Sequence, residues 1–140
     1  MIRKATVRRG AIVLAAMTVA LLAVAGVALA EVFTGTRGSD VIYGTNDRDT
    51  IRGLGGSDGL NGKRGADLLY GGRGNDLLSD GPVREQATDR LYAGPGRDRI
   101  RANNSPDHKD VVYCGPGRDT VENADSNDRL IGCEVIKGIR

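Results

Sequence analysis

From Gly35 to Ser79 the chain reads GTRGSDVIY GTNDRDTIR GLGGSDGLN GKRGADLLY GGRGNDLLS, five nine-residue units without a break. Every unit has Asp at position 6 and a large aliphatic residue at position 8. A fixed period means that each unit repeats one backbone shape, so the sequence predicts a repeat protein. Glycines at positions 1, 2 and 4 favour a tight turn, because glycine adopts positive φ at little cost.

The pairing of an acid with an aliphatic continues beyond these five units. Inserted residues around Asp80 to Arg84 and around Ala102 to Asn104 interrupt the period. Nine residues before Ile42 stands Phe33, and nine after Leu130 stands Ile139, so we expect the aliphatic column to reach both ends of the repeat region. The ten aspartates are Asp40, Asp49, Asp58, Asp67, Asp76, Asp89, Asp98, Asp110, Asp119 and Asp128. Their partners are Ile42, Ile51, Leu60, Leu69, Leu78, Leu91, Ile100, Val112, Val121 and Leu130.

The units resemble the glycine-rich nonapeptide of repeats-in-toxin (haemolysin-type) calcium-binding proteins, G-G-x-G-x-D-x-U-x, where U is a large aliphatic. The resemblance implies an all-β fold, a parallel β-roll in which two nonapeptides make one coil of a two-sheet solenoid. Positions 7 to 9 would form a very short strand with U pointing inward. The turns GTRGSD, GLGGSD, GGRGND, AGPGRD and CGPGRD belong to the odd units, and all keep Gly at position 4. Only one even unit does, so we expect the two edges of the roll to differ.

Stacked aspartates on adjacent coils would lie about 4.8 Å apart and repel one another. Spacing alone therefore indicates a need for a cation, and the resemblance implies Ca²⁺, which binds carboxylate and carbonyl oxygens in flexible geometry. We expect sites between successive odd aspartates, one more between Asp49 and Asp67, and weak or no binding at later even turns. The predicted metal residues are Asp40, Asp58, Asp76, Asp98, Asp119, Asp49, Asp67, Gly35, Gly38, Gly53, Gly56, Gly71 and Gly74.

Residues 1–30 differ in kind from the rest. A basic start precedes the apolar run from Ala11 to Ala30, and Ala28-Leu29-Ala30 has the pattern of a cleavage site. We interpret 1–30 as a secretory signal peptide and 31–140 as one domain; an uncleaved membrane anchor is the alternative. Cleavage would leave 16 basic and 18 acidic residues, a net charge of −2. Because the arginines alternate with the aspartates, we expect no nucleic-acid partner, and no membrane contact after cleavage.

The two cysteines and the tyrosines fall at definite places in the register. Cys114 is position 1 of the ninth unit and Cys133 position 2 of what would be the eleventh. They would therefore lie on neighbouring coils at a spacing that suits a disulfide, in agreement with an exported protein. Tyr70, Tyr92 and Tyr113 all occupy position 9 of even units. We expect them to stack on one sheet face, either as packing or as a strip for a polysaccharide or cell-surface protein.

These observations favour an extracellular calcium-binding protein that folds when it meets calcium and has no catalytic activity. An adhesion module of the cell envelope, with the roll as its scaffold, is the alternative. An accessory part of a secreted hydrolase is less well supported, because the chain has no HExxH or GxSxG motif.

Overall fold

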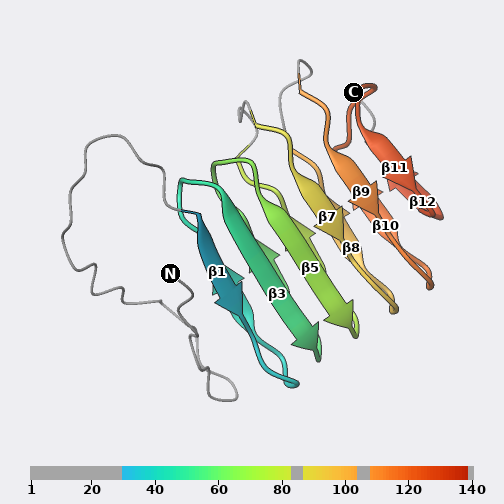
Figure 1. The fold of residues 1–140 in the computed structure, drawn as a ribbon. Coiled ribbons are helices and arrows are strands. Elements are labelled where there is room, and N and C mark those ends of the chain that lie inside the picture. The colour runs from blue at the N-terminus through green and yellow to red at the C-terminus, as the bar shows by residue number, and fades with distance from the viewer. Residues whose placement is uncertain (1–29, 83–86, 104–107, 139–140) are drawn as a thin grey trace, which may run out of the picture.

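The computed structural model describes residues 30–82, 87–103 and 108–138, which form two parallel sheets wound as one β-roll (Figure 1). One sheet, here sheet A, contains β1 (Glu31–Thr34), β3 (Asp49–Gly55), β5 (Leu68–Arg73), β7 (Arg90–Tyr92), β9 (Val111–Tyr113) and β11 (Arg129–Ile131). The other, sheet B, contains β2 (Val41–Tyr43), β4 (Gly59–Asn61), β6 (Leu77–Ser79), β8 (Arg99–Arg101), β10 (Thr120–Glu122) and β12 (Val135–Lys137).

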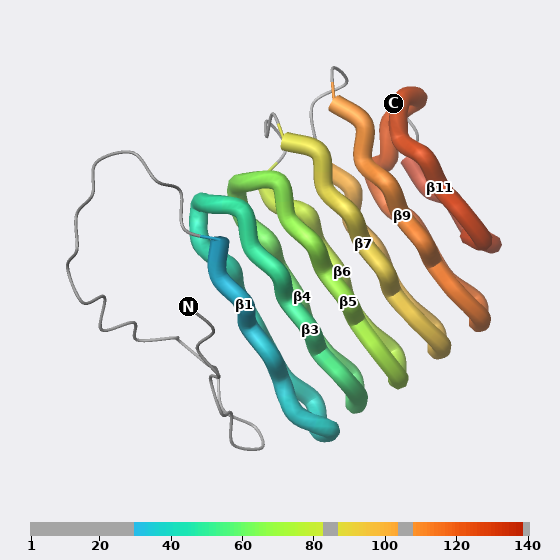
Figure 2. Tube along the Cα trace, in the orientation of Figure 1, coloured from blue at the N-terminus to red at the C-terminus, as the bar shows by residue number. Residues whose placement is uncertain are grey.

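Successive strands alternate between the sheets, so two nonapeptides complete one coil, as predicted. The tube in Figure 2 follows this path from coil to coil. The register pairs equivalent positions on adjacent coils, for example Ile51 with Leu69 and Leu60 with Leu78. The all-β parallel β-roll expected from the sequence is therefore confirmed.

The core is a double row of single side chains, one from position 8 of each unit. These side chains point between the sheets and lose nearly all contact with water; Ile51, Leu69 and Leu91 are fully buried. Phe33 ends the column at the N-terminal side and is 7% exposed. Such a thin core buries little apolar surface per residue, so the fold depends heavily on its turns.

The odd turns are held close together by glycine at position 4. A Cβ on Gly74 would overlap the carbonyl oxygen of Gly56 in the preceding coil, and one on Gly96 would overlap that of Gly74. Gly74 also has φ +130°, a conformation that other residues rarely adopt. This contact explains why odd units keep a residue that most even units have lost.

The C-terminal coil is closed by a disulfide between Cys114 and Cys133, whose Cα atoms are 5.2 Å apart, as the register predicted. The expectation that Ile139 continues the aliphatic column is wrong. The register pairs Ile136 with Val121, so Ile136 has the strand position expected of Ile139, with 42% of the residue exposed, and Ile139 lies outside the described residues. The cause is the short connection between β11 and β12, which has only three residues.

The tyrosines at position 9 stack on the outer face of sheet A. The ring centroids of Tyr70 and Tyr92 are 5.0 Å apart, and those of Tyr92 and Tyr113 are 4.7 Å apart at an interplanar angle of 4°. The guanidinium group of Arg52 lies over Tyr70, 5.6 Å from its centroid. The ring faces that point towards each other within this stack are therefore covered by neighbouring rings.

The signal peptide expected over residues 1–30 lies almost wholly outside the described part, so it stays a prediction. In the part that the structure describes, no helix has the length and apolar character needed to cross a membrane.

Candidate metal centre

Position-6 aspartates form one ladder along each edge of the roll, and each ladder is linked by hydrogen bonds. On the odd edge, the backbone N–H of each aspartate donates to Oδ1 of the aspartate one coil later. These N···O distances are 2.9 Å for Asp40 to Asp58, 2.9 Å for Asp58 to Asp76, 2.8 Å for Asp76 to Asp98 and 2.8 Å for Asp98 to Asp119. The carboxylates are thereby fixed in one orientation.

The same geometry recurs on the even edge, although most of its turns lack glycine at position 4. Its links run from Asp49 to Asp67 at 2.8 Å, from Asp67 to Asp89 at 2.6 Å, from Asp89 to Asp110 at 2.8 Å and from Asp110 to Asp128 at 3.0 Å. The nitrogen of Glu31 begins this ladder by donating to Oδ1 of Asp49 at 3.2 Å. Glu134 ends the odd ladder, because its Oε2 accepts from the N–H of Asp119 at 2.8 Å.

On the odd edge, one oxygen of each carboxylate takes part in no hydrogen bond. Oδ2 of Asp58, Asp76, Asp98 and Asp119 is buried and has no hydrogen-bond partner. In the first coil the roles differ, since Oδ2 of Asp40 accepts from the Thr36 hydroxyl at 3.0 Å and Oδ1 has no partner. Buried carboxylate oxygens without donors are costly. They are the kind of group that a cation satisfies.

Burial works against ionisation of these acids. It raises the pKa of Asp58 from 3.8 to about 6, assisted by the charges of Asp76 and Asp40. It also raises the pKa of Asp98 to about 7, and the pKa values of Asp76 and Asp119 shift in the same direction. Desolvation is the main cause in each case, and hydrogen bonds from backbone N–H groups oppose it only in part. A dication between the carboxylates would remove this penalty.

The glycines predicted at the site lie beside these oxygens. Position-1 glycines leave the room that the carboxylate occupies: a Cβ on Gly35 would stand 2.6 Å from Oδ2 of Asp40, and one on Gly71 would stand 2.6 Å from Oδ2 of Asp76. Gly53 meets Asp58 in the same way. Gly38, Gly56 and Gly74 form the close stack at position 4 described above. The oxygen-only donor set and the space beside it fit a hard cation such as Ca²⁺.

Asp80 is a buried acid that sequence reasoning did not place among the ligands. It follows Ser79 and so occupies position 1 of the next even turn, where the other even turns have glycine, alanine or asparagine. Its carboxylate lies within 4.8 Å of those of Asp89 and Asp110. Burial and the charges of these two neighbours raise the pKa of Asp80 to about 9. Asp80 stands at position 1 and not at position 6, so the pattern of position-6 acids did not mark it.

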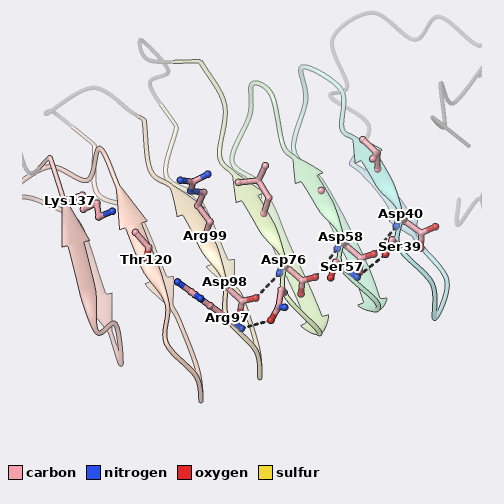
Figure 3. Close-up of a pocket in the computed structure, with 14 residues that line it drawn as sticks. Ser39, Asp40, Ser57, Asp58, Asp76, Arg97, Asp98, Arg99, Thr120 and Lys137 are labelled. Carbon is pink, nitrogen blue, oxygen red and sulfur yellow. Dashed lines mark hydrogen bonds between the residues drawn. The ribbon is translucent and has the colours of Figure 1, made fainter. Parts of the chain in front are cut away.

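An open groove follows the odd ladder along the outer side of sheet B (Figure 3). The floor of the groove is formed by Asp40, Asp58, Asp76 and Asp98. Its rim is formed by exposed side chains of the turns and strands. The structure thus brings four of the five odd aspartates to a single surface feature. Asp49 and Asp67 lie on the opposite edge, in the even ladder.

Comparison with known families agrees with this geometry. The RTX calcium-binding nonapeptide repeat (4 copies) matches residues 26–60, 60–79 and 86–121, more than half of the chain. No curated protein and no solved structure matches the chain significantly. A chain that repeats this nonapeptide and folds it into a two-sheet roll with buried aspartate ladders belongs to the RTX calcium-binding nonapeptide repeat family.

Proposed function

We propose that the protein is secreted, binds calcium along its aspartate ladders, folds when it meets extracellular calcium, and has no catalytic activity. The observation that carries this proposal is the row of buried Oδ2 atoms without partners, repeated from coil to coil on the odd edge. One isolated atom of this kind would be a local defect. A repeated set is a series of equivalent ligand positions.

The sites on the odd edge would lie between neighbouring aspartates, at 40/58, 58/76, 76/98 and 98/119. In each, two carboxylates and the carbonyl groups of the turns would supply the oxygens. On the even edge, Asp49 and Asp67 form the corresponding pair. The group of Asp80, Asp89 and Asp110 adds an oxygen donor set at a turn where the sequence suggested weak binding or none.

Folding and calcium binding would be coupled, because the roll has a core only one side chain wide in each sheet. Without the cation, the buried acids must remain protonated or bear unfavourable charge. With it, the binding free energy contributes directly to folding. We therefore expect the chain to be largely unfolded without calcium at neutral pH. An affinity of about 10⁻⁴–10⁻³ M would match extracellular calcium modules.

Export is supported by the apolar N-terminal segment with its Ala28-Leu29-Ala30 end and by the disulfide, which persists in oxidising compartments. The absence of catalysis is supported by the structural role of the acids: all eleven buried aspartates accept hydrogen bonds from backbone N–H groups.

The experiment that tests the proposal is circular dichroism of the purified protein during titration with calcium, with EDTA as the calcium-free reference. We expect β-structure to appear with calcium at neutral pH and to disappear with EDTA. A protein that is equally β-structured in EDTA would contradict coupled folding. Magnesium serves as the control cation, because its tight octahedral preference suits this donor arrangement less well.

A further inference from the structure

Acidic and basic side chains alternate in the sequence, yet the fold separates them. Eleven aspartates are buried, whereas every arginine and lysine that the structure describes is exposed. Within the described residues, 14 basic side chains share the surface with five acidic ones. Those five are Glu31, Asp47, Glu122, Asp128 and Glu134. The exterior is strongly basic although the expected mature chain has a net charge of −2.

Part of this charge gathers on the outer face of sheet B towards its C-terminal end. Arg99 and Arg101 point outward from β8, with 57% and 44% of their side chains exposed. Glu122 of β10 forms an ion pair with each, its carboxylate oxygens lying 3.1 Å from Nε of Arg99 and 3.6 Å from Nε of Arg101. It thereby holds the two guanidinium groups side by side. With Arg97 and Lys137, these residues make up a surface that we call the basic face.

The groove over the odd ladder leads into the basic face (Figure 3). Ser39, Ser57 and Asn75 line the part of the groove near the N-terminal coils, and Arg97, Arg99 and Lys137 line the part near the C-terminal coils. Hydroxyl and amide groups suit the hydroxyl groups of sugars, while arginine and lysine suit carboxylate or sulfate groups.

The sign of the charge in the groove depends on calcium. Four aspartates and three basic side chains line it, so the ionised metal-free groove has a slight excess of negative charge. Each calcium ion placed between two of these aspartates adds two positive charges. The loaded groove is therefore clearly positive, and it attracts an anionic ligand more strongly than the ionised metal-free groove does. This step rests on the calcium binding proposed above.

We propose that the groove and the basic face bind an acidic polysaccharide when calcium is bound. Its anionic groups would lie on Arg99, Arg101 and Lys137, and its hydroxyl groups on Ser39, Ser57 and Asn75. The groove runs across several coils and is open, as an extended chain requires. The lining contains no aromatic ring on which a nucleobase would stack. The tyrosine stack is on the other sheet, with its inner ring faces covered.

The test measures binding of short hyaluronan oligosaccharides, as a carboxylated probe, to the purified protein in calcium. Dextran is the neutral control. We expect Arg99→Ala/Arg101→Ala to raise the hyaluronan Kd by about tenfold, since two of the positive charges of the basic face are lost. The matched control is Arg90→Ala/Arg129→Ala, which removes two exposed arginines from the outer face of sheet A and should leave the Kd within about twofold.

Glu122→Gln provides a test of opposite sign. It removes the acid from the basic face and should tighten hyaluronan binding, whereas Asp47→Asn changes the net charge equally on an exposed even turn and should not. Calorimetric titration of every variant with calcium separates the proposed calcium binding from the proposed binding of an acidic polysaccharide. Calcium binding without hyaluronan binding would overturn this inference alone. Equal binding of dextran, equal effects of the two arginine pairs, or tighter binding to duplex DNA or phosphatidylserine vesicles would also overturn it.

Discussion

The backbone N–H of Asp58 donates to Oδ1 of Asp76 over 2.9 Å, while Oδ2 of Asp76 is buried without a hydrogen-bond partner. One oxygen of the carboxylate therefore builds the roll, and the other is available to a cation. This division lets one residue type serve both the fold and the proposed metal site.

Asp76→Asn should weaken calcium binding without unfolding the loaded protein. Asparagine retains an oxygen that can accept from the Asp58 N–H, but it lacks the charge that attracts the ion. We expect a loss of about 1–3 kcal/mol in calcium binding free energy, measured by isothermal titration calorimetry. Asp47→Asn makes the same charge change on an exposed side chain and is the control. Equal losses in the two variants would contradict the assignment of Asp76.

The metal-free protein should become less stable as the pH rises, the reverse of ordinary acid denaturation. Burial raises the pKa of Asp58 from 3.8 to about 6 and that of Asp98 to about 7, so the folded form holds protons that the unfolded chain releases. This contribution is fully present below about pH 3.8 and is lost as the pH rises through 6 to 7. Thermal unfolding in EDTA between about pH 4 and 8 measures it.

Calcium should reverse this trend, because protons and the cation compete for the same oxygens. In saturating calcium we expect the unfolding temperature to be lower at about pH 5 than at about pH 7. A metal-free protein whose stability rises between these two values would show that the odd carboxylates are not forced towards their protonated form.

Gly74→Ala should be among the most damaging small substitutions in the chain. The added Cβ would overlap the carbonyl oxygen of Gly56, and φ at this position is +130°. We expect a loss of more than about 3 kcal/mol in the free energy of unfolding, measured by urea denaturation in calcium. Gly55→Ala is the matched control, since its Cβ would meet nothing closer than the Arg73 carbonyl oxygen at 3.6 Å. Its effect should stay within about 1 kcal/mol.

Loss of the disulfide should loosen the last coil in particular. Cys114→Ala/Cys133→Ala removes a link across 19 residues, worth about 3 kcal/mol by chain entropy. Alanine fits the buried position of Cys114, because Ala93 occupies the equivalent place one coil earlier. Hydrogen exchange should speed up at Cys114 N–H, which donates to the Ile131 carbonyl, while the Leu77 amide in the middle of the roll keeps its protection. Uniform loss of protection would contradict a local role.

Removal of the proposed leader after Ala30 would turn the Glu31 nitrogen into an ammonium group, 3.2 Å from Oδ1 of the fully buried Asp49. A chain that begins at Glu31 should therefore be more stable than its N-acetylated form, by about 1 kcal/mol at low salt. Thermal denaturation measures the difference. In the Asp49→Asn background the difference should shrink towards zero, and an unchanged difference would place its origin elsewhere.

Much of the fold follows from the nine-residue period, because the period fixes which residues meet. The inward column, the pairing of strands two units apart and the Cys114–Cys133 bridge all depend on register alone. Features at the insertions and at the chain ends do not follow from the register alone. The three-residue link before β12 put Ile136 where Ile139 was expected, and the inserted turn brought Asp80 inward.

Charge separation was also hidden from the sequence. Arginine and aspartate alternate in the sequence and recur in the same turns, so the pattern gives no sign of a basic patch. In the fold, the side chain at position 6 turns inward and the one at position 7 of the same unit turns outward, as Asp98 and Arg99 show. Neighbours in sequence therefore face opposite sides of one sheet.

The ladder has a direction. Asp58 donates its N–H to Asp76 and accepts at its carbonyl oxygen from the N–H of Leu77, so both partners of its backbone belong to the following coil. A chain that appears from its N-terminus cannot complete a coil until about twenty more residues have emerged. During synthesis, each coil is therefore completed only after the following coil has been made. In the described part of the chain, the odd ladder ends at Glu134, whose Oε2 accepts from the N–H of Asp119.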